Sequence, residues 1–252
     1  GVTLTNTSLL PWNPPAALAN GRAILKAAAP VQAQSIMGWG VGKPEPSPGQ
    51  YDWASLDARM AIITASSSAP VITLCCSPDW MKGGQAGTTN WNDLAIAPTP
   101  NQYPAFAQLA VAVARRYPQV HHFQVWNEFK GFWSSSLNRW DYEKYTLLYN
   151  GVFTALKAYN PLLKIGGPYA PLTTWSSPSA GGHPSAITGP WGTVDQRALD
   201  AVSYWLAHAA GADFLAVDGG LATRDNPQPS DPLAAAGYFA AVTSWLHQRT
   251  SL

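Results

Sequence analysis

Charged side chains are scarce in this sequence. They make up 12% of its 252 residues, and 15 Lys and Arg stand against 14 Asp and Glu, a formal net charge of +1. Proteins that bind nucleic acid or anionic membranes need clustered positive charge, so we expect neither partner. A neutral surface rich in Ser, Thr, Asn and Pro favours a secreted or extracytoplasmic protein, which we expect to be a monomer.

Long apolar runs and cysteine are also lacking. No stretch approaches the roughly 18 to 20 apolar residues that span a bilayer, and the sequence does not open with a charged leader and an apolar block. We therefore expect no membrane span, and that any signal peptide has been removed. The two cysteines, Cys75 and Cys76, are adjacent, which gives neither a loop-closing bridge nor metal-ligand spacing. We interpret them as strand thiols that face opposite sides; a disulfide between them or a reactive thiol is the alternative.

Aromatic residues, by contrast, are abundant, with twelve Trp and ten Tyr. Flat rings fill protein cores, and they also stack on the apolar faces of sugar rings. Seven Trp fall in or beside long segments that follow predicted strands. These are Trp39, Trp80, Trp91, Trp133, Trp140, Trp175 and Trp191. That placement favours a ligand-binding role for some of them.

Short β-branched or apolar runs alternate with amphipathic helical patterns, which is typical of parallel βαβ units. The predicted strands are Val2 to Thr5, Val31 to Met37, Val71 to Cys76, Phe123 to Asn127, Lys164 to Gly167 and Phe214 to Asp218. The predicted helices are Trp53 to Ser66, Asn101 to Arg116, Asp141 to Tyr159, Val194 to Ala209 and Pro232 to Arg249. We therefore predict an α/β fold, a (β/α)8 TIM-type barrel with about six βα units present. Residues 1–252 are expected to form one catalytic barrel domain that lacks its last two units.

The most specific run is Phe123 to Glu128, a strand whose last residues deliver an amide and a carboxylic acid to the barrel's mouth. Its Trp-Asn-Glu ending resembles the fourth strand of clan A glycoside hydrolases. The runs Tyr51-Asp52-Trp53, Ser77-Pro78-Asp79-Trp80-Met81 and Ile165-Gly166-Gly167-Pro168 resemble segments of glycoside hydrolase family 39. The resemblance implies a retaining O-glycosidase acting on a polysaccharide or glycoside. It also implies that Glu128 is the acid/base and that Asn127 binds the sugar's 2-hydroxyl.

Breaking a glycosidic bond requires protonation of a poor leaving group, which suits a carboxylic acid at a barrel mouth. We expect Trp126, Phe129 and Trp133 to surround Glu128 and help it to keep a proton. The alternative for Glu128 is an ion pair with Lys130 at the surface, and for Asn127 it is a loop cap.

A retaining mechanism needs a second carboxylate, which in clan A is a Glu that ends the seventh strand. Glu45 lies in a Pro-rich loop and Glu143 inside a predicted helix, so neither has that position. We expect the nucleophile beyond Leu252; the alternative is Asp218, which otherwise is expected to bind substrate. No cofactor is implied, because two carboxylates suffice for the reaction.

Four further residues are predicted to bind substrate because each follows a strand: Asp79 and Trp80, Trp133, and Tyr169. Ordinary loop packing is the alternative for Asp79 and Tyr169. The five His lack ligand-like spacing, so no metal site is expected. The second strand's end lacks the Arg that many clan A enzymes place there. A different class remains open, a catalytically inactive carbohydrate-binding barrel, because Glu128 is the only well-placed carboxylate.

Overall fold

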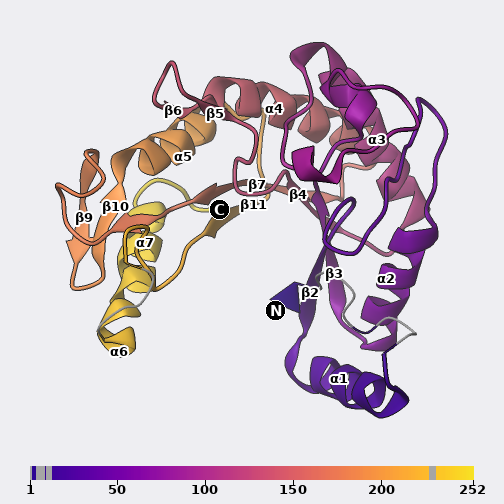
Figure 1. The fold of residues 1–252 in the computed structure, drawn as a ribbon, viewed down its shortest axis with the longest axis horizontal. Coiled ribbons are helices and arrows are strands. Elements are labelled where there is room, and N and C mark those ends of the chain that lie inside the picture. The colour runs from indigo at the N-terminus through magenta and orange to yellow at the C-terminus, as the bar shows by residue number, and fades with distance from the viewer. Residues whose placement is uncertain (1, 4–8, 10–12, 227–230) are drawn as a thin grey trace.

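Six parallel strands form the central sheet of the computed structural model, which describes residues 2–3, 9, 13–226 and 231–252. Their order in the sheet is β1-β2-β3-β4-β7-β11. The strands are β1 (Val2–Thr3), β2 (Val31–Ser35), β3 (Ala69–Leu74), β4 (His122–Val125), β7 (Lys164–Pro171) and β11 (Phe214–Asp218). The sheet curls into an open arch, so the predicted partial (β/α)8 barrel is confirmed (Figure 1). Residues 4 and 5 of the first predicted strand lie outside the described residues.

Helices cover the outer side of the arch (Figure 1). They are α1 (Pro15–Ala28), α2 (Ala54–Ala65), α3 (Tyr103–Arg116), α4 (Tyr142–Tyr159), α5 (Gln196–His208), α6 (Pro232–Ala235) and α7 (Gly237–His247). In α3, Phe106, Leu109 and Val113 form a fully buried stripe at helical spacing, as the sequence predicts. None of the helices in the described part combines the length and apolar character needed to cross a bilayer.

Two predictions about helices need correction. No helix is predicted between the first two strands, but α1 lies there with a single buried side chain, Leu25, and therefore a weak apolar stripe. The predicted helix Pro232 to Arg249 is divided into α6 and α7 at Ala236. The other four predicted helices are confirmed, with ends that differ by at most two residues.

Irregular structure is concentrated after the strands. Three short 3-10 helices, Asp79–Lys82, Trp91–Asp93 and Pro100–Gln102, follow β3. The small strands β5 (Trp133–Ser134) and β6 (Arg139–Trp140) pair in the segment after β4. A second small sheet, β8-β10-β9, follows β7 and comprises β8 (Thr174–Trp175), β9 (Pro184–Gly189) and β10 (Gly192–Asp195). These additions enlarge the carboxyl end of the arch, where barrel enzymes bind their ligands.

The interpretation of the cysteines as strand thiols is wrong. Cys75 and Cys76 are joined by a disulfide, and both are fully buried. Side chains alternate between the two faces only within a strand, and β3 ends at Leu74. The alternation that was expected to separate the two sulfur atoms therefore does not reach them.

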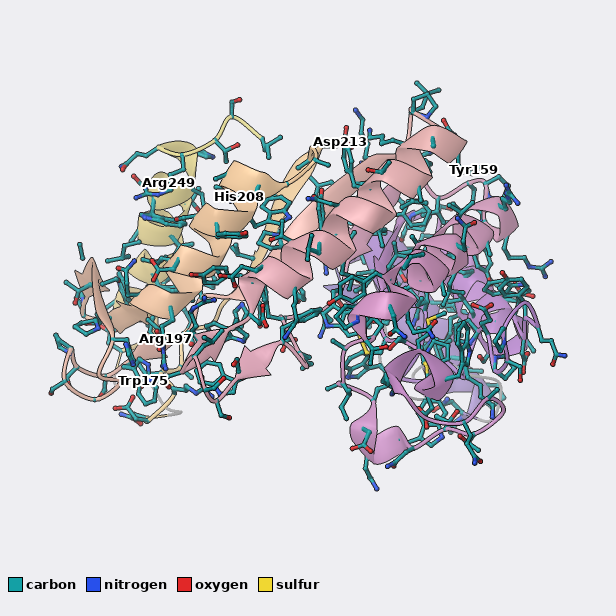
Figure 2. All side chains as sticks on the ribbon, turned by 90° about the horizontal axis from the view of Figure 1, so that it is seen from above. Tyr159, Trp175, Arg197, His208, Asp213 and Arg249 are labelled. Atoms are coloured by element: carbon teal, nitrogen blue, oxygen red, sulfur yellow. A yellow bond between two sulfur atoms is a disulfide. The ribbon has the colours of Figure 1, made fainter. Side chains whose placement is uncertain are left out.

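Different residues lie at the carboxyl ends and at the amino ends of the parallel strands. Figure 2 shows α4 and α5 side by side, with Tyr159 and Asp213 at one end and Trp175 and Arg197 at the other. Trp175 follows the carboxyl end of β7 and Arg197 opens α5, so their end is the carboxyl end of the strands. Asp213, which precedes β11, marks the opposite end.

Candidate active site

The chain leaves β4 through a segment of unusual backbone. Trp126, Glu128 and Phe129 have φ angles of 66°, 53° and 53°. Large side chains in this left-handed region cost free energy, on the order of 1–3 kcal/mol each, and persist only where the surroundings hold them. These angles turn Glu128 out of the direction that a continuing strand would give it.

Buried aromatic rings hold this segment. Trp126 is fully buried, and its indole N–H donates to the carbonyl of Lys130 at 2.7 Å. The ring of Phe129 lies 4.2 Å from that of Tyr145 on α4, and Tyr145 donates its hydroxyl to the carbonyl of Val125 at 2.9 Å. The left-handed residues Trp126 and Phe129 are therefore anchored in the core, which fixes the backbone that carries Glu128.

Glu128 lines a cavity of about 220 Å³ at the carboxyl ends of the strands. Strands β1, β2 and β7 and the segments that follow β2 and β4 contribute to its wall. The lining residues are Thr3, Ser35, Trp39, Asn127, Glu128, Lys130 and Tyr169. Side chains with hydroxyl, amide, carboxyl and indole groups thus surround one space, which suits a ligand with several hydroxyls.

The carboxylate of Glu128 already has two partners. Asn127 Nδ2 donates to its Oε1 at 3.2 Å, and Lys130 Nζ lies 3.0 Å from its Oε2. The ammonium of Lys130 is also 5.1 Å from the centroid of the Trp39 ring. The ion pair with Lys130, which was the alternative for Glu128, is therefore present, and it lies in the cavity.

Tyr169 enters the cavity at an irregularity of β7. The pairing of β7 with β11 shifts between Pro168 and Ala170, so Tyr169 is the extra residue, with a φ of 50°. Burial, reinforced by the charges of Asp218 and Glu128, raises the pKa of Tyr169 to about 12. Its phenol therefore keeps its proton and can donate a hydrogen bond at any ordinary pH.

Asp218 ends β11 close enough for its charge to interact with that of Glu128. Burial, with the charge of Glu128, raises the pKa of Asp218, although the backbone N–H of Gly219 and the charge of Lys130 oppose this. Asp218 is half-buried but does not line the cavity. It therefore stands near the Glu128 group without being part of the cavity wall.

Three predicted substrate-binding residues lie away from this cavity. Asp79 is buried, pairs with Lys82 at 3.2 Å and accepts a hydrogen bond from the backbone of Asn90. Trp80 donates its indole N–H to the carbonyl of Glu45 at 2.9 Å. Trp133 lines a different cavity. The structure therefore brings together Asn127, Glu128 and Tyr169 from the predicted set.

Sequence reasoning missed Thr3, Ser35, Trp39 and Lys130 as cavity residues. Ser35 ends β2 and Trp39 follows it, so the rule that sites form at strand ends could have found both. The predicted aromatic surroundings of Glu128 also differ. Trp126 and Phe129 are buried in the core, and the aromatic residues that line the cavity with Glu128 are Trp39 and Tyr169.

The other two glutamates, Glu45 and Glu143, interact with residues outside this cavity. Glu45 is 5% exposed, its Oε1 accepts a hydrogen bond from the N–H of Gly49, and burial raises its pKa. Glu143 forms a two-point ion pair with Arg139, both contacts at 2.8 Å. Among the residues in the described ranges, no group of three or more His, Cys, Asp or Glu is arranged to hold a metal ion.

No protein-family model and no curated protein matches the sequence. Solved structures do match. A glycoside hydrolase family 39 enzyme from Xanthomonas axonopodis pv. citri is 21% identical with a TM-score of 0.61, covering 99% of this chain and 47% of its own. A monomeric β-xylosidase from Caulobacter crescentus CB15 is 20% identical with a TM-score of 0.60, covering 94% and 47%. A β-glucosidase is 16% identical with a TM-score of 0.58, covering 92% and 64%.

This chain thus spans about half the length of the first two of these relatives. The likeness shows that it has the barrel fold of family 39 and related glycoside hydrolases. The fold implied by its motifs is confirmed.

Proposed function

We propose that this chain belongs to a retaining O-glycosidase in which Glu128 is the acid/base. The observation that carries the proposal is the position of Glu128, in a cavity at the carboxyl ends of the strands together with Asn127, Tyr169 and Trp39. Enzymes with this fold bind substrate at that end. The solved relatives named as a β-xylosidase and a β-glucosidase support a glycoside as the substrate.

In the proposed reaction, protonated Glu128 donates its proton to the glycosidic oxygen while the bond to the anomeric carbon breaks. A second carboxylate attacks that carbon from the opposite face, and Glu128 then removes a proton from the water that releases the sugar. Asn127 and Tyr169 are proposed to hold sugar hydroxyls, and Trp39 to face the ring. We assign no nucleophile. Asp218 is proposed to contact substrate near the reacting carbon, since its charge and that of Glu128 interact.

The ion pair does not prevent this role. Its side chains are 31% and 34% exposed, and ion pairs as exposed as this contribute about 0–1 kcal/mol. A bound glycoside can therefore displace the ammonium of Lys130 from Glu128 at small cost, so that the carboxyl can take up a proton.

The test compares wild type with Glu128→Gln on unactivated xylobiose and on 4-nitrophenyl β-xyloside and β-glucoside. Removing a general acid typically costs 10²- to 10⁴-fold, so we expect a loss of about that size on the disaccharide. The loss should be smaller on the nitrophenyl glycosides, whose leaving group needs no proton. Glu143→Gln, which alters a carboxylate paired with Arg139, is the matched control and should keep its activity. Equal hydrolysis of xylobiose by wild type and Glu128→Gln would refute the role.

A second candidate is a carbohydrate-binding barrel that does not cleave. It is favoured by one observation, that Glu128 is the only carboxylate lining the cavity among the described residues. Calorimetric binding of xylobiose by wild type, with no product released over days, would support this candidate against the enzyme. On either proposal, the neutral surface favours a protein that acts on glycans outside the cell.

A further inference from the structure

A second cavity adjoins the segment that carries Glu128. Its volume is about 310 Å³, and its wall comes from the segment before α3, the segment after β4 and the start of α4. Lys130 lines the Glu128 cavity whereas the next residue, Gly131, lines the second one. Gly131 has a φ of 77°, and a Cβ there would clash with the backbone of Ala95 and Ala97. The two cavities are thus lined by neighbouring residues of one segment.

Trp133 is the exposed ring of this second cavity. The residue is 44% exposed, and it lines the cavity together with the buried Phe132. The guanidinium of Arg197 lies 5.1 Å from the centroid of its ring, and Trp140 packs edge-on at 5.4 Å. Arg197 is itself fixed by contacts of 2.9 and 2.7 Å with the buried Asp195. The indole is therefore held in one position, which lowers the entropy cost of binding a ligand against it.

A tyrosine lies in the same wall. Tyr103 is 8% exposed, and it lines the cavity. Burial, with the charge of Asp141, raises the pKa of Tyr103 to about 12, so the hydroxyl remains a donor. Because Tyr103 lines the cavity, its hydroxyl can donate a hydrogen bond to a hydroxyl of a bound ligand.

The two charged residues of the cavity wall, Asp141 and Lys144, form an ion pair with each other. Asp141 Oδ1 accepts the backbone N–H of Lys144 at 3.1 Å, and its Oδ2 lies 2.7 Å from Lys144 Nζ. The remaining polar side chains of the wall are the hydroxyls of Thr99 and Ser134. A cavity with a flat ring, neutral hydroxyls and no net charge favours a ligand of the same character, with an apolar face and hydroxyl groups at its edge.

We propose that this cavity binds a pyranose ring of a neutral oligosaccharide against Trp133, at a site separate from the Glu128 cavity. Binding here requires no action by Glu128, so the inference goes beyond the proposed cleavage. Because neighbouring residues, Lys130 and Gly131, line the two cavities, a glycan held at Trp133 would keep a polymer next to the barrel mouth.

The experiment follows the indole N–H signals of uniformly 15N-labelled protein during titration with xylohexaose. The signal of Trp133 is assigned by its loss in Trp133→Phe. We expect it to shift and to saturate, both in wild type and in Glu128→Gln. Trp91, which is 51% exposed and does not line the cavity, is the matched control whose signal should stay in place.

A second variant tests the hydroxyl alone. Tyr103→Phe keeps the ring, so the fold is retained, and the half-saturation concentration read at Trp133 should rise about threefold to tenfold. Tyr51→Phe, an exposed tyrosine outside the cavity, should leave it unchanged.

Three results would overturn the proposal. They are no shift of the Trp133 signal, a shift with oligogalacturonate but not with xylohexaose, and an unchanged half-saturation in Tyr103→Phe. If the Trp133 signal does not shift and Glu128→Gln is inactive, this inference is refuted and the proposed catalysis is retained. If the Trp133 signal shifts and Glu128→Gln is as active as wild type, this inference is retained and the proposed catalysis is refuted.

Discussion

At the scale of single residues, the Glu128 cavity combines an ionisable group with donors of fixed protonation. Asn127 cannot titrate, and Tyr169 has a pKa of about 12. The groups proposed to hold the sugar therefore keep their hydrogen-bonding roles while the acid/base changes its charge. The contributions of Asn127 and Tyr169 to activity are therefore expected not to change with pH.

Tyr169→Phe removes one donor from the cavity and leaves the ring. We expect kcat/KM on xylobiose to fall about threefold to tenfold, the value of one hydrogen bond to substrate. Because the Tyr169 phenol is protonated throughout pH 5 to 9, the ratio of wild type to variant should be constant over that range. Tyr159→Phe, an exposed tyrosine at the end of α4, serves as the control. A ratio that changes with pH would contradict the assigned role, as would unchanged activity.

At the scale of elements, Asp213 connects α4 to the sheet at the end opposite the candidate site (Figure 2). Lys157 Nζ of α4 lies 2.8 Å from its Oδ2, and the N–H of Ile165 in β7 donates to the same oxygen at 2.9 Å. Burial alone would raise the pKa of Asp213, but these hydrogen bonds and the charges of Lys157 and Lys164 outweigh it and lower that pKa. The Asp213 carboxylate thus links α4 to the start of β7.

Asp213→Asn should lower the free energy of unfolding in urea by about 2 kcal/mol at pH 7, since hydrogen bonds to a charged group are lost. A carboxyl whose folded-state pKa is depressed stabilises the fold above its unfolded pKa of about 3.9, and this stability is lost as pH falls through the folded-state pKa. The difference between wild type and variant should therefore be full at pH 6 and shrink below about pH 4. Asp200→Asn, at an exposed position on α5, is the control. A difference that persists at pH 2 would show that the charge is not the cause.

At the scale of the whole molecule, one continuous core joins all six βα units. Buried apolar residues from Leu25 on α1 to Trp245 on α7 form a single cluster. Elements that share a core unfold together in small proteins. That the described residues form a single domain stays a prediction, which unfolding can test.

We predict one cooperative unfolding transition in urea. Tryptophan fluorescence should follow residues throughout the arch, because Trp126 and Trp205 are buried on different elements. Far-UV circular dichroism follows the helices, and the two curves should coincide. Two separate transitions would contradict a single domain.

The sequence by itself determined the order of the strands and the end of the sheet at which Glu128 lies. Both follow from local patterns, since β-branched runs favour strands and the residue after a strand emerges at its carboxyl end. Helix α3 was predictable for the same reason, because its buried stripe repeats at helical spacing.

Only the tertiary structure decided which side chains meet. Lys130 beside Glu128, Trp39 beneath Lys130 and Trp133 in a separate cavity all depend on how loops fold after the strands. These loops turn through left-handed residues such as Trp126 and Glu128, which their residue types do not favour. Packing of buried rings imposes those angles, and such packing joins residues far apart in the chain, which local sequence patterns do not encode.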